Sequence, residues 1–270
     1  MSVTTIAPPT ARLIEVFSAI QGEGLNVGTR QIFIRFGLCD LRCDFCDSAH
    51  TWEAPDTCRR EKTPGDRDFE IHSNPISLPE LLEWIGAQDE PNLHDSISLT
   101  GGEPLLHASF LKEFLPQVKR RTGLPIYLET GGHRPQQLKS IISALDSVGM
   151  DLKLPSVSGE THWEAHREFL QLCCLAQIEV FVKIIISDRT SLTDLQRAAE
   201  LVAGVSAEVP IFLQPVTPLT PAEAGRFGSK MPPKMEPPAP TKVLAWQALM
   251  KGWHKPVRVV PQTHKLLSQL

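Results

Sequence analysis

The sequence predicts an α/β fold in which most strands are parallel. Short apolar runs alternate along the chain with stretches whose apolar residues recur at i, i+3 and i+4, a pattern typical of successive βα units. The 270 residues, 41% of them hydrophobic, suit one large domain with a substantial core. Six βα units are too few for a closed eight-stranded barrel. We therefore expect a single domain over residues 1–270, built as a partial, open (βα)6-type barrel, with a doubly wound sheet as the alternative.

The predicted elements follow one another in order along the chain. The alternating run Leu13–Ile20 has the pattern of an edge strand. Apolar runs then predict six further strands: Gln31–Leu38, Ser96–Thr100, Ile126–Glu129, Met150–Leu154, Val180–Ile186 and Ile211–Gln214. Amphipathic spacing predicts the helices between them: Leu78–Ala87, Ala108–Arg120, Pro135–Val148, Thr161–Leu175 and Leu192–Ala203. Near the end of the chain, Val257–Val260 has the composition of a strand.

Two segments interrupt this alternation. Glu53–Pro75 is polar and charged and falls inside the first βα unit, and we expect an insertion over residues 53–77. Pro215–Pro240 contains eight prolines and is not expected to form regular structure, so residues 215–240 are a second predicted insertion. Both are expected to be surface insertions or mobile flaps.

Charge and composition exclude several classes of partner. The net charge is −4 and the pI is about 6.1, which does not suggest nucleic-acid or membrane-surface binding. No apolar run reaches the length of a membrane span. Met1–Pro9 has no basic region followed by an apolar stretch, so we expect no signal peptide and a cytoplasmic protein with reduced thiols. A small-molecule site is the remaining expectation.

The run Gly37–Asp47 carries three cysteines, Cys39, Cys43 and Cys46, at spacings of four and three. Three thiolates can hold three corners of a [4Fe-4S] cluster and leave the fourth iron open to another ligand. A zinc site is the alternative, since His50 could complete a Cys3His set. The other cysteines have no metal-ligand spacing and are expected to be incidental: Cys58, Cys173 and Cys174.

Polar residues and glycines follow the predicted strands where each one ends. In parallel βα architectures the active site lies at the carboxyl ends of the strands. After the cysteine loop, the strand ends carry Thr100–Pro104, Glu129–Gly132, Asp151–Lys153, Ser187–Asp188 and Gln214–Pro215. Their convergence on one site favours a cofactor-dependent active site over a zinc knuckle.

These motifs resemble those of the radical S-adenosylmethionine (SAM) superfamily. Phe45 fills the aromatic position of the Cys-x3-Cys-x-aromatic-Cys signature, and Gly101-Gly102-Glu103-Pro104 resembles the GGEP motif of the superfamily. The resemblance implies that the open iron binds SAM, whose reductive cleavage then yields a 5′-deoxyadenosyl radical. It also implies a set of SAM-binding residues: Phe45, Gly101, Gly102, Glu103, Glu129, Thr130, Asp151, Lys153 and Gln214. For each of the last five, a structural role remains the alternative.

Four further features narrow the prediction. Gln21-Gly22-Glu23-Gly24 could form a hairpin turn or a hydrogen-bonding edge for a pterin-like ring. Arg35 precedes the first cluster cysteine by four residues and could clamp a carboxylate, or form a salt bridge outside the barrel. The Ser48 hydroxyl, two residues after Cys46, suits Mg²⁺ if substrate oxygens and water complete the shell. The tail residues Gln262, His264 and Lys265 could close over the site.

Together these features resemble the 7-carboxy-7-deazaguanine synthase family of queuosine and 7-deazapurine biosynthesis. The resemblance implies a Mg²⁺-dependent lyase that converts 6-carboxy-5,6,7,8-tetrahydropterin to 7-carboxy-7-deazaguanine with loss of ammonia and regenerates SAM. It also implies a homodimer and an external reductant such as flavodoxin or ferredoxin. Substrate binding would fall to Gln21, Glu23, Arg35 and Thr100. In this family the residue at position 48 is often Thr, and Ser48 keeps the hydroxyl. The alternatives are an activating enzyme for glycyl-radical proteins and a zinc-stabilised binding module.

Overall fold

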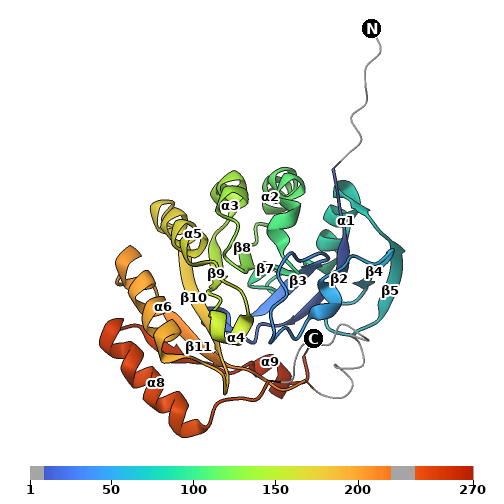
Figure 1. Cartoon of the computed structure of the whole chain (residues 1–270). Coiled ribbons are helices and arrows are strands. Elements are labelled where there is room, and N and C mark those ends of the chain that lie inside the picture. The colour runs from blue at the N-terminus through green and yellow to red at the C-terminus, as the bar shows by residue number, and fades with distance from the viewer. Residues whose placement is uncertain (1–8, 220–234, 270) are drawn as a thin grey trace.

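The computed structural model describes residues 9–219 and 235–269 and shows a curved, open α/β sheet with helices along its outer side (Figure 1). The main sheet has ten strands in the order β12-β11-β10-β9-β8-β7-β3-β2-β4-β5. Because β12 and β5 lie at opposite edges, the sheet does not close. This arrangement confirms the predicted partial barrel with mostly parallel strands.

Seven neighbouring strands of the sheet run parallel to one another. They are β3 (Arg30–Phe36), β7 (Ser96–Gly101), β8 (Ile126–Thr130), β9 (Ser147–Asp151), β10 (Glu179–Ile186), β11 (Ile211–Pro215) and β12 (Val257–Val259). One boundary prediction is wrong: the predicted helix Pro135–Val148 ends early, as α3 (Pro135–Ile141) and a single 3-10 turn. The following strand begins at Ser147, three residues before the predicted start, because its backbone pairs there with both β8 and β10.

The remaining part of the sheet departs from the prediction. Strand β2 (Leu13–Ile20) has the predicted bounds but is not an edge strand, since it pairs antiparallel with β3 and parallel with β4 (Thr57–Glu61). Strand β5 (Phe69–Ser73) pairs antiparallel with β4. Residues 53–77, predicted as a surface insertion or mobile flap, contain the β4–β5 hairpin, which extends the sheet beyond β2. A small separate sheet joins β1 (Thr10–Ala11) to β6 (Ile76–Ser77).

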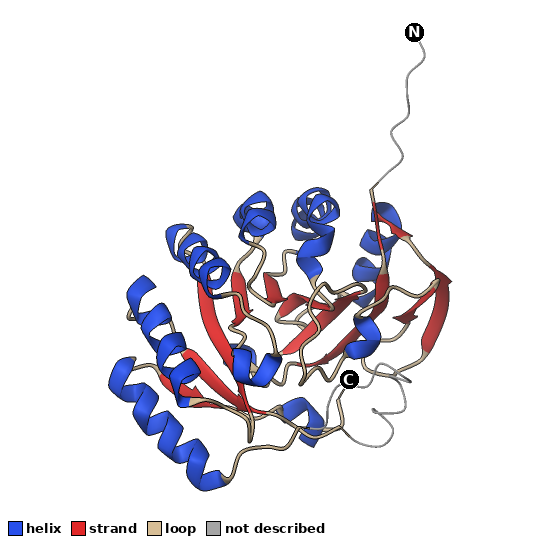
Figure 2. Ribbon diagram, in the orientation of Figure 1, coloured by secondary structure: helices blue, strands red, loops and turns tan. Residues whose placement is uncertain are grey.

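Helices cover the outer side of the sheet and bury its main core (Figure 2). They are α1 (Leu78–Gln88), α2 (Ala108–Thr122), α3, α5 (Trp163–Leu175), α6 (Leu192–Val205) and α8 (Pro240–Trp253). Their apolar stripes pack on alternate strand residues such as Ile32, Ile34 and Phe36. The short helix α4 (Pro155–Ser158) contributes Val157 to the same core, and the short helix α9 (Thr263–Leu266) lies against Gly22.

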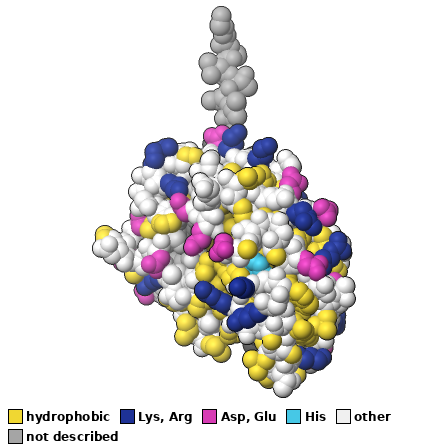
Figure 3. Space-filling view, turned by 90° about the vertical axis from the view of Figure 1, so that its left-hand side faces the viewer, with side chains coloured by type: hydrophobic (Ala, Val, Ile, Leu, Met, Phe, Trp, Pro, Cys, Tyr) yellow, Lys and Arg dark blue, Asp and Glu magenta, His cyan; other side chains and the backbone are white. Residues whose placement is uncertain are grey.

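Helix α8 was not predicted, because it directly follows the proline-rich segment. Much of the predicted insertion over residues 215–240 falls outside the described residues. The helix buries Trp246 and Met250 and leaves Leu244 and Leu249 exposed. Figure 3 views the molecule from the side that carries α6 and α8, where hydrophobic side chains lie among Lys, Arg, Asp and Glu. Within the described ranges, no helix is both long and apolar enough to cross a membrane.

Candidate active site

A cavity of about 780 Å³ lies on the inner face of the sheet. All but one of the residues predicted to bind the cluster, SAM, Mg²⁺ or substrate, or to close the site, line it: Gln21, Glu23, Arg35, Cys39, Cys43, Phe45, Cys46, Ser48, Thr100, Gly101, Gly102, Glu103, Glu129, Thr130, Asp151, Lys153, Gln262, His264 and Lys265. The exception is Gln214, which lines a smaller adjoining cavity. One strand-end prediction is wrong, because Ser187 and Asp188 line neither cavity; Ser187 is instead buried at the start of the next turn.

The three predicted cluster cysteines share this cavity as free thiols. Burial raises the pKa of Cys39 to about 12 and that of Cys43 to about 11, and it also raises the pKa of Cys46. Thiols with such pKa values stay protonated until a metal takes the place of the proton. Cys46 is tied to Cys43 by a backbone hydrogen bond of 3.1 Å, so the two lie on one tight turn.

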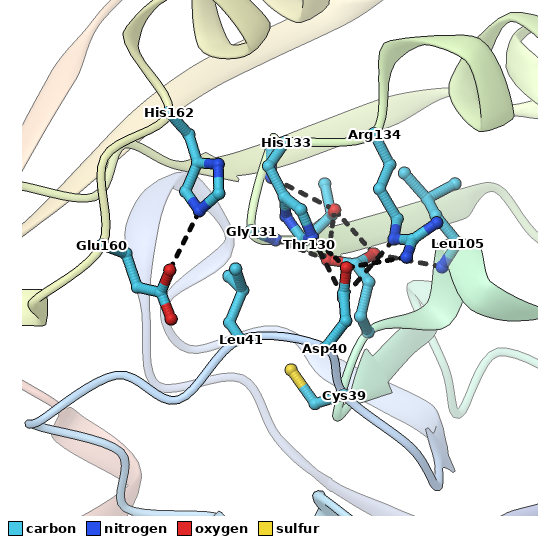
Figure 4. A network of polar contacts seen from close by, with 12 residues as sticks. Cys39, Asp40, Leu41, Leu105, Thr130, Gly131, His133, Arg134, Glu160 and His162 are labelled. Carbon is cyan, nitrogen blue, oxygen red and sulfur yellow. Dashed lines mark hydrogen bonds and ion pairs between the residues drawn. The ribbon is translucent and has the colours of Figure 1, made fainter.

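Two acidic side chains anchor the cysteine loop to the rest of the barrel (Figure 4). Asp40, between the first two cysteines, lies 3.0 Å from His133 Nε2 and accepts a hydrogen bond of 2.7 Å from Arg134 Nη2. Glu160 accepts a hydrogen bond of 2.8 Å from the backbone N–H of Arg42 and lies 3.1 Å from His162. The loop is therefore held from the β8–α3 connection on one side and from the α4–α5 connection on the other.

The Gly101-Gly102 pair allows the strand end of β7 to approach the backbone of the cysteine loop. A Cβ on Gly101 would lie 2.2 Å from the Phe36 carbonyl oxygen, and one on Gly102 would lie 2.1 Å from the Leu38 carbonyl oxygen. No side chain fits at these distances. The next residue, Glu103, is fully buried, and its carboxylate accepts hydrogen bonds from Thr130 Oγ1 and from the backbone N–H of Leu105.

The donor set fits an iron–sulfur cluster better than a single ion. Within residues 9–219 and 235–269, no three His, Cys, Asp or Glu side chains come close enough to hold one metal ion. A structural zinc site needs four ligands in tetrahedral geometry. Three free thiols spread around one cavity suit the corners of a larger cluster instead.

Glu23 lies at the centre of a polar group on the inner face. Gln214 and Gln262 each donate to its Oε1, at 3.0 and 2.8 Å. Lys183 Nζ forms an ion pair with its Oε2. Burial alone would raise the pKa of Glu23, but the Lys183 ammonium outweighs it and lowers that pKa. Lys183 is one of the cavity residues that sequence reasoning missed, because it lies within β10 and not after its end.

Glu129 has the opposite electrostatic character. It accepts hydrogen bonds from Thr100 Oγ1 at 2.7 Å and from Gln21 Nε2 at 2.9 Å. Burial raises the pKa of Glu129, and the neighbouring Glu23 carboxylate adds to that increase. The two acidic side chains therefore differ: Glu23 is held as an anion, while Glu129 retains a proton more readily than an ordinary glutamate.

Asp151 and the two nearby lysines form a second ionic group. Its Oδ2 lies 2.7 Å from Lys153 Nζ, and its Oδ1 lies 3.1 Å from Lys183 Nζ. Burial opposes ionisation of Asp151, but the two ammonium groups outweigh it and lower the pKa of Asp151. Lys153 Nζ also lies 5.0 Å from the ring centroid of Phe45, which connects this group to the cysteine loop.

The C-terminal tail lies against the Gln21–Gly24 segment. The backbone N–H of Thr263 donates to the Gly22 carbonyl at 3.0 Å, and a Cβ on Gly22 would lie 2.2 Å from His264 Nδ1. Asp47, which directly follows the last cluster cysteine, accepts from Gln262 Nε2 at 2.8 Å. Lys265 Nζ lies 3.2 Å from the same carboxylate. Burial alone would raise the pKa of Asp47, but Lys265 and Gln262 lower it to about 2.

Arg35 lines the cavity and also forms an ion pair. Its Nε donates to Glu15 Oε1 at 2.7 Å. Sequence reasoning offered a carboxylate clamp and a salt bridge as alternatives, and the side chain combines a salt bridge with a position in the cavity. Ser48 also lines the cavity, with its Oγ 3.9 Å from Cys46 Sγ.

Comparison with known proteins extends these observations. The family model of the Radical SAM superfamily matches residues 33–202. The chain is 41% identical to the 7-carboxy-7-deazaguanine synthase of Geobacter sulfurreducens, over 98% of this chain and 100% of the relative. It is 31% identical to the corresponding synthase of Archaeoglobus fulgidus, over 96% of this chain and 98% of the relative. The crystal structure of QueE from Escherichia coli has the same fold, with a TM-score of 0.57 at 20% identity over 94% of each chain.

The alternatives left open by the sequence gain no support from these matches. Neither a glycyl-radical activating enzyme nor a zinc-stabilised module accounts for a full-length match to a synthase. The motifs that carried the resemblance lie around one cavity. The chain therefore belongs to the 7-carboxy-7-deazaguanine synthase family of radical SAM lyases, enzymes that use a [4Fe-4S] cluster and SAM.

Proposed function

We propose that this chain converts 6-carboxy-5,6,7,8-tetrahydropterin to 7-carboxy-7-deazaguanine with release of ammonia, a step of queuosine and 7-deazapurine biosynthesis. One observation carries the proposal: the cavity that contains the three cluster cysteines also contains a polar edge, Gln21 and Glu23, and an arginine, Arg35. A bicyclic substrate with an amide-like edge and a carboxylate needs both features.

The cofactor residues have separate roles in this proposal. Cys39, Cys43 and Cys46 would hold the cluster, and the Gly101–Glu103 backbone and carboxylate would bind the methionyl end of SAM. The other predicted SAM contacts are Phe45, Glu129, Thr130, Asp151, Lys153 and Gln214. When bound, the cluster and SAM would supply a carbon radical able to remove hydrogen from C6 of the substrate. Protein side chains mainly position the reactants and keep water away.

The substrate edge would be bound by Gln21, Glu23 and Thr100. The lowered pKa of Glu23 keeps its carboxylate as an acceptor for the N–H groups of a pterin. Gln214, Gln262 and Lys183 fix the orientation of that carboxylate. Because this carboxylate is already fixed, the protein loses less side-chain entropy when the substrate binds.

The substrate carboxylate would be bound by Arg35 and by Mg²⁺. Among the described residues, the only hydrogen bond of the Arg35 guanidinium uses Nε, so both terminal nitrogens are available for a bidentate contact. Ser48 would offer one hydroxyl to the ion, and substrate oxygens and water would complete its shell.

The tail would close the cavity over the bound substrate. Gln262 and Lys265 contact Asp47, and His264 lies against Gly22, so the tail contacts two separate segments that line the cavity. Exclusion of water protects a reactive radical from side reactions.

Two partners complete the proposal. An external reductant such as flavodoxin or ferredoxin would supply the electron. The chain would also form a homodimer, and the exposed Leu244 and Leu249 of α8 offer apolar surface for it. Light scattering of the purified protein tests the second point, with a monomer mass as the contrary result.

An anaerobic assay tests the proposed reaction directly. The protein, reconstituted with iron and sulfide, is mixed with SAM, Mg²⁺, a reductant and 6-carboxy-5,6,7,8-tetrahydropterin, and the products are identified by mass spectrometry. The expected products are 7-carboxy-7-deazaguanine and ammonia in equal amounts. Cleavage of SAM without formation of the deazaguanine would show that the substrate is a different molecule.

A further inference from the structure

Three charged side chains form a row across neighbouring strands on the inner face. Glu15 of β2 pairs in register with Arg35 of β3 on one side and with Arg59 of β4 on the other. All three line the cavity. Arg59 lies on β4, which belongs to the hairpin inserted after the cysteine loop. The insertion therefore supplies one of the three charged residues of the row.

Glu15 holds both guanidinium groups by separate oxygens. Arg35 Nε donates to Oε1 at 2.7 Å, and Arg59 Nε donates to Oε2 at 2.7 Å. The Nη2 atom of Arg59 lies 2.5 Å from the same Oε2. Burial alone would raise the pKa of Glu15, but the two arginines outweigh it and lower that pKa, so the carboxylate stays ionised.

The row carries more positive charge and more donors than Glu15 can satisfy. One carboxylate against two guanidinium groups leaves a net charge of +1. Within the described part of the chain, Nη1 and Nη2 of Arg35 and Nη1 of Arg59 take part in no hydrogen bond. Unused donors beside a cavity favour an anionic ligand with at least two oxygens.

The hairpin fixes Arg59 in place. Its guanidinium carbon lies 4.1 Å from the ring centroid of Phe69, which is on the neighbouring strand β5. Arg60, the next residue on β4, points to the opposite face, where it lies 5.8 Å from the ring centroid of Trp84 and 3.6 Å from Glu70. The strand therefore presents one arginine to the cavity and the other to the helix side.

We infer that Arg59 is a second arginine for the substrate carboxylate, and that Glu15 positions Arg35 and Arg59 as a pair. The inference rests on the proposed function, because it takes the carboxylated pterin as the ligand. The inference gives the β4–β5 hairpin a role in substrate binding, because the hairpin then forms one wall of the substrate site. Through Arg59, the hairpin would select for a carboxylate at position 6 of the pterin.

Binding of two ligands that differ only in the carboxylate tests the inference. The reconstituted protein, with oxidised cluster and SAM but without reductant, is titrated calorimetrically with 6-carboxy-5,6,7,8-tetrahydropterin and with 5,6,7,8-tetrahydropterin. Loss of one charge-assisted contact in Arg59→Ala is expected to weaken binding of the carboxylated ligand by about tenfold or more. Binding of the ligand without the carboxylate should stay within about twofold of wild type. Arg59→Lys should recover only part of the affinity, because an ammonium lacks the planar fork.

Arg60→Ala is the matched control, since it removes the same charge from the same strand on the opposite face. It should leave the affinities for both ligands unchanged. Equal loss for both ligands in Arg59→Ala, or no loss for either, overturns the assignment. If the proposed function is wrong, the wild-type protein itself will not bind the carboxylated pterin. That result differs from those that overturn the role of Arg59.

Discussion

Lys183 and Asp151 face each other in register on the neighbouring strands β10 and β9, with Lys183 Nζ 3.1 Å from Asp151 Oδ1. The same ammonium forms an ion pair with Glu23. One lysine therefore forms ion pairs with two acidic side chains from separate segments of the chain. Burial alone would lower the pKa of Lys183, but Asp151 and Glu23 outweigh it and raise that pKa, so the lysine stays charged.

Replacing Lys183 by Met should destabilise the protein strongly. It leaves Glu23 without its cation, and breaking a buried ion pair from one side costs about 3–5 kcal/mol. Urea unfolding measures this change in the free energy of unfolding. Lys251→Met on exposed α8 is the control and should change the free energy of unfolding by less than about 0.5 kcal/mol. Similar values for the two variants would mean that Glu23 does not depend on Lys183.

Each of the cluster cysteines should be indispensable. Cys39→Ala, Cys43→Ala and Cys46→Ala should each lose most of the bound iron and abolish turnover, because a cluster needs all three thiolates. Cys58→Ala and Cys174→Ala should retain both, since neither side chain belongs to the loop between Gly37 and Asp47. Iron and sulfide analysis of anaerobically purified protein provides the measurement. Loss of the cluster in Cys58→Ala as complete as that in Cys43→Ala would contradict the ligand assignment.

Arg35→Ala should weaken substrate binding while the cluster spectrum and SAM binding stay intact. Loss of a desolvated charge pair predicts a decrease of about 2–4 kcal/mol in binding free energy. Arg35→Lys should restore part of this, because an ammonium does not reproduce the two-pronged contact. Calorimetric titration with the carboxylated pterin gives the affinity. Normal affinity in Arg35→Ala would remove the carboxylate clamp from the proposal.

The proposed Mg²⁺ site predicts how variants of Ser48 should respond to the ion. Ser48→Ala should blunt the increase in activity on addition of Mg²⁺, because the ion loses its protein hydroxyl. Ser48→Thr keeps the hydroxyl and should respond like wild type. The measurement is initial rate against Mg²⁺ concentration. A full response in Ser48→Ala would place the ion elsewhere.

Mild acid should destabilise the fold through buried histidines. Burial lowers the pKa of His166 to about 3, and that of His94 to about 4, so both stay neutral in the folded protein at pH 5. In the unfolded chain a histidine takes up a proton below about pH 6.5. Stability is therefore fully present above that pH and is lost as the pH falls toward the folded pKa, at up to about 1.4 kcal/mol per pH unit for each histidine.

Unfolding in urea at pH 7.5, 6.5 and 5.5 measures this loss. His166→Gln keeps a donor for the Gly131 carbonyl, which lies 3.1 Å from His166 Nε2, but removes the titrating group. Its stability should fall less steeply with decreasing pH than that of wild type. Parallel pH profiles for the two proteins would exclude His166 as a source of the acid sensitivity.

The parallel core was predictable because its strands are buried on both faces and therefore read as continuous apolar runs. The polar residues after those strands could be predicted for the same reason, since a change from apolar to polar marks each strand end. Lys183 was not predicted as a site residue because it lies inside the strand run Glu179–Ile186, where no change from apolar to polar residues marks it as a strand end. A lone lysine in an otherwise apolar strand is itself a signal, because a buried ammonium requires a partner.

The β4–β5 hairpin and α8 lacked such signals. The sequence of β4 is Thr-Cys-Arg-Arg-Glu, and Cys58 is its only buried hydrophobic residue. No alternation of apolar and polar residues therefore marks it as a strand. Helix α8 buries only Trp246 and Met250 among its 14 residues, which is too weak a stripe to distinguish it from the preceding proline-rich segment. Tertiary contacts decide both elements, and a single sequence does not contain them.

The contact between the tail and the Gln21–Gly24 segment has a consequence for how the protein is made. Glu23 and Gln262 are 239 positions apart in the chain, and Asp47 and Gln262 are 215 apart. A ribosome therefore releases the cysteine loop long before it releases the segment that covers the loop. The tail contact of Asp47, the residue next to the last cysteine of the loop, therefore forms only after almost the whole chain has been synthesised.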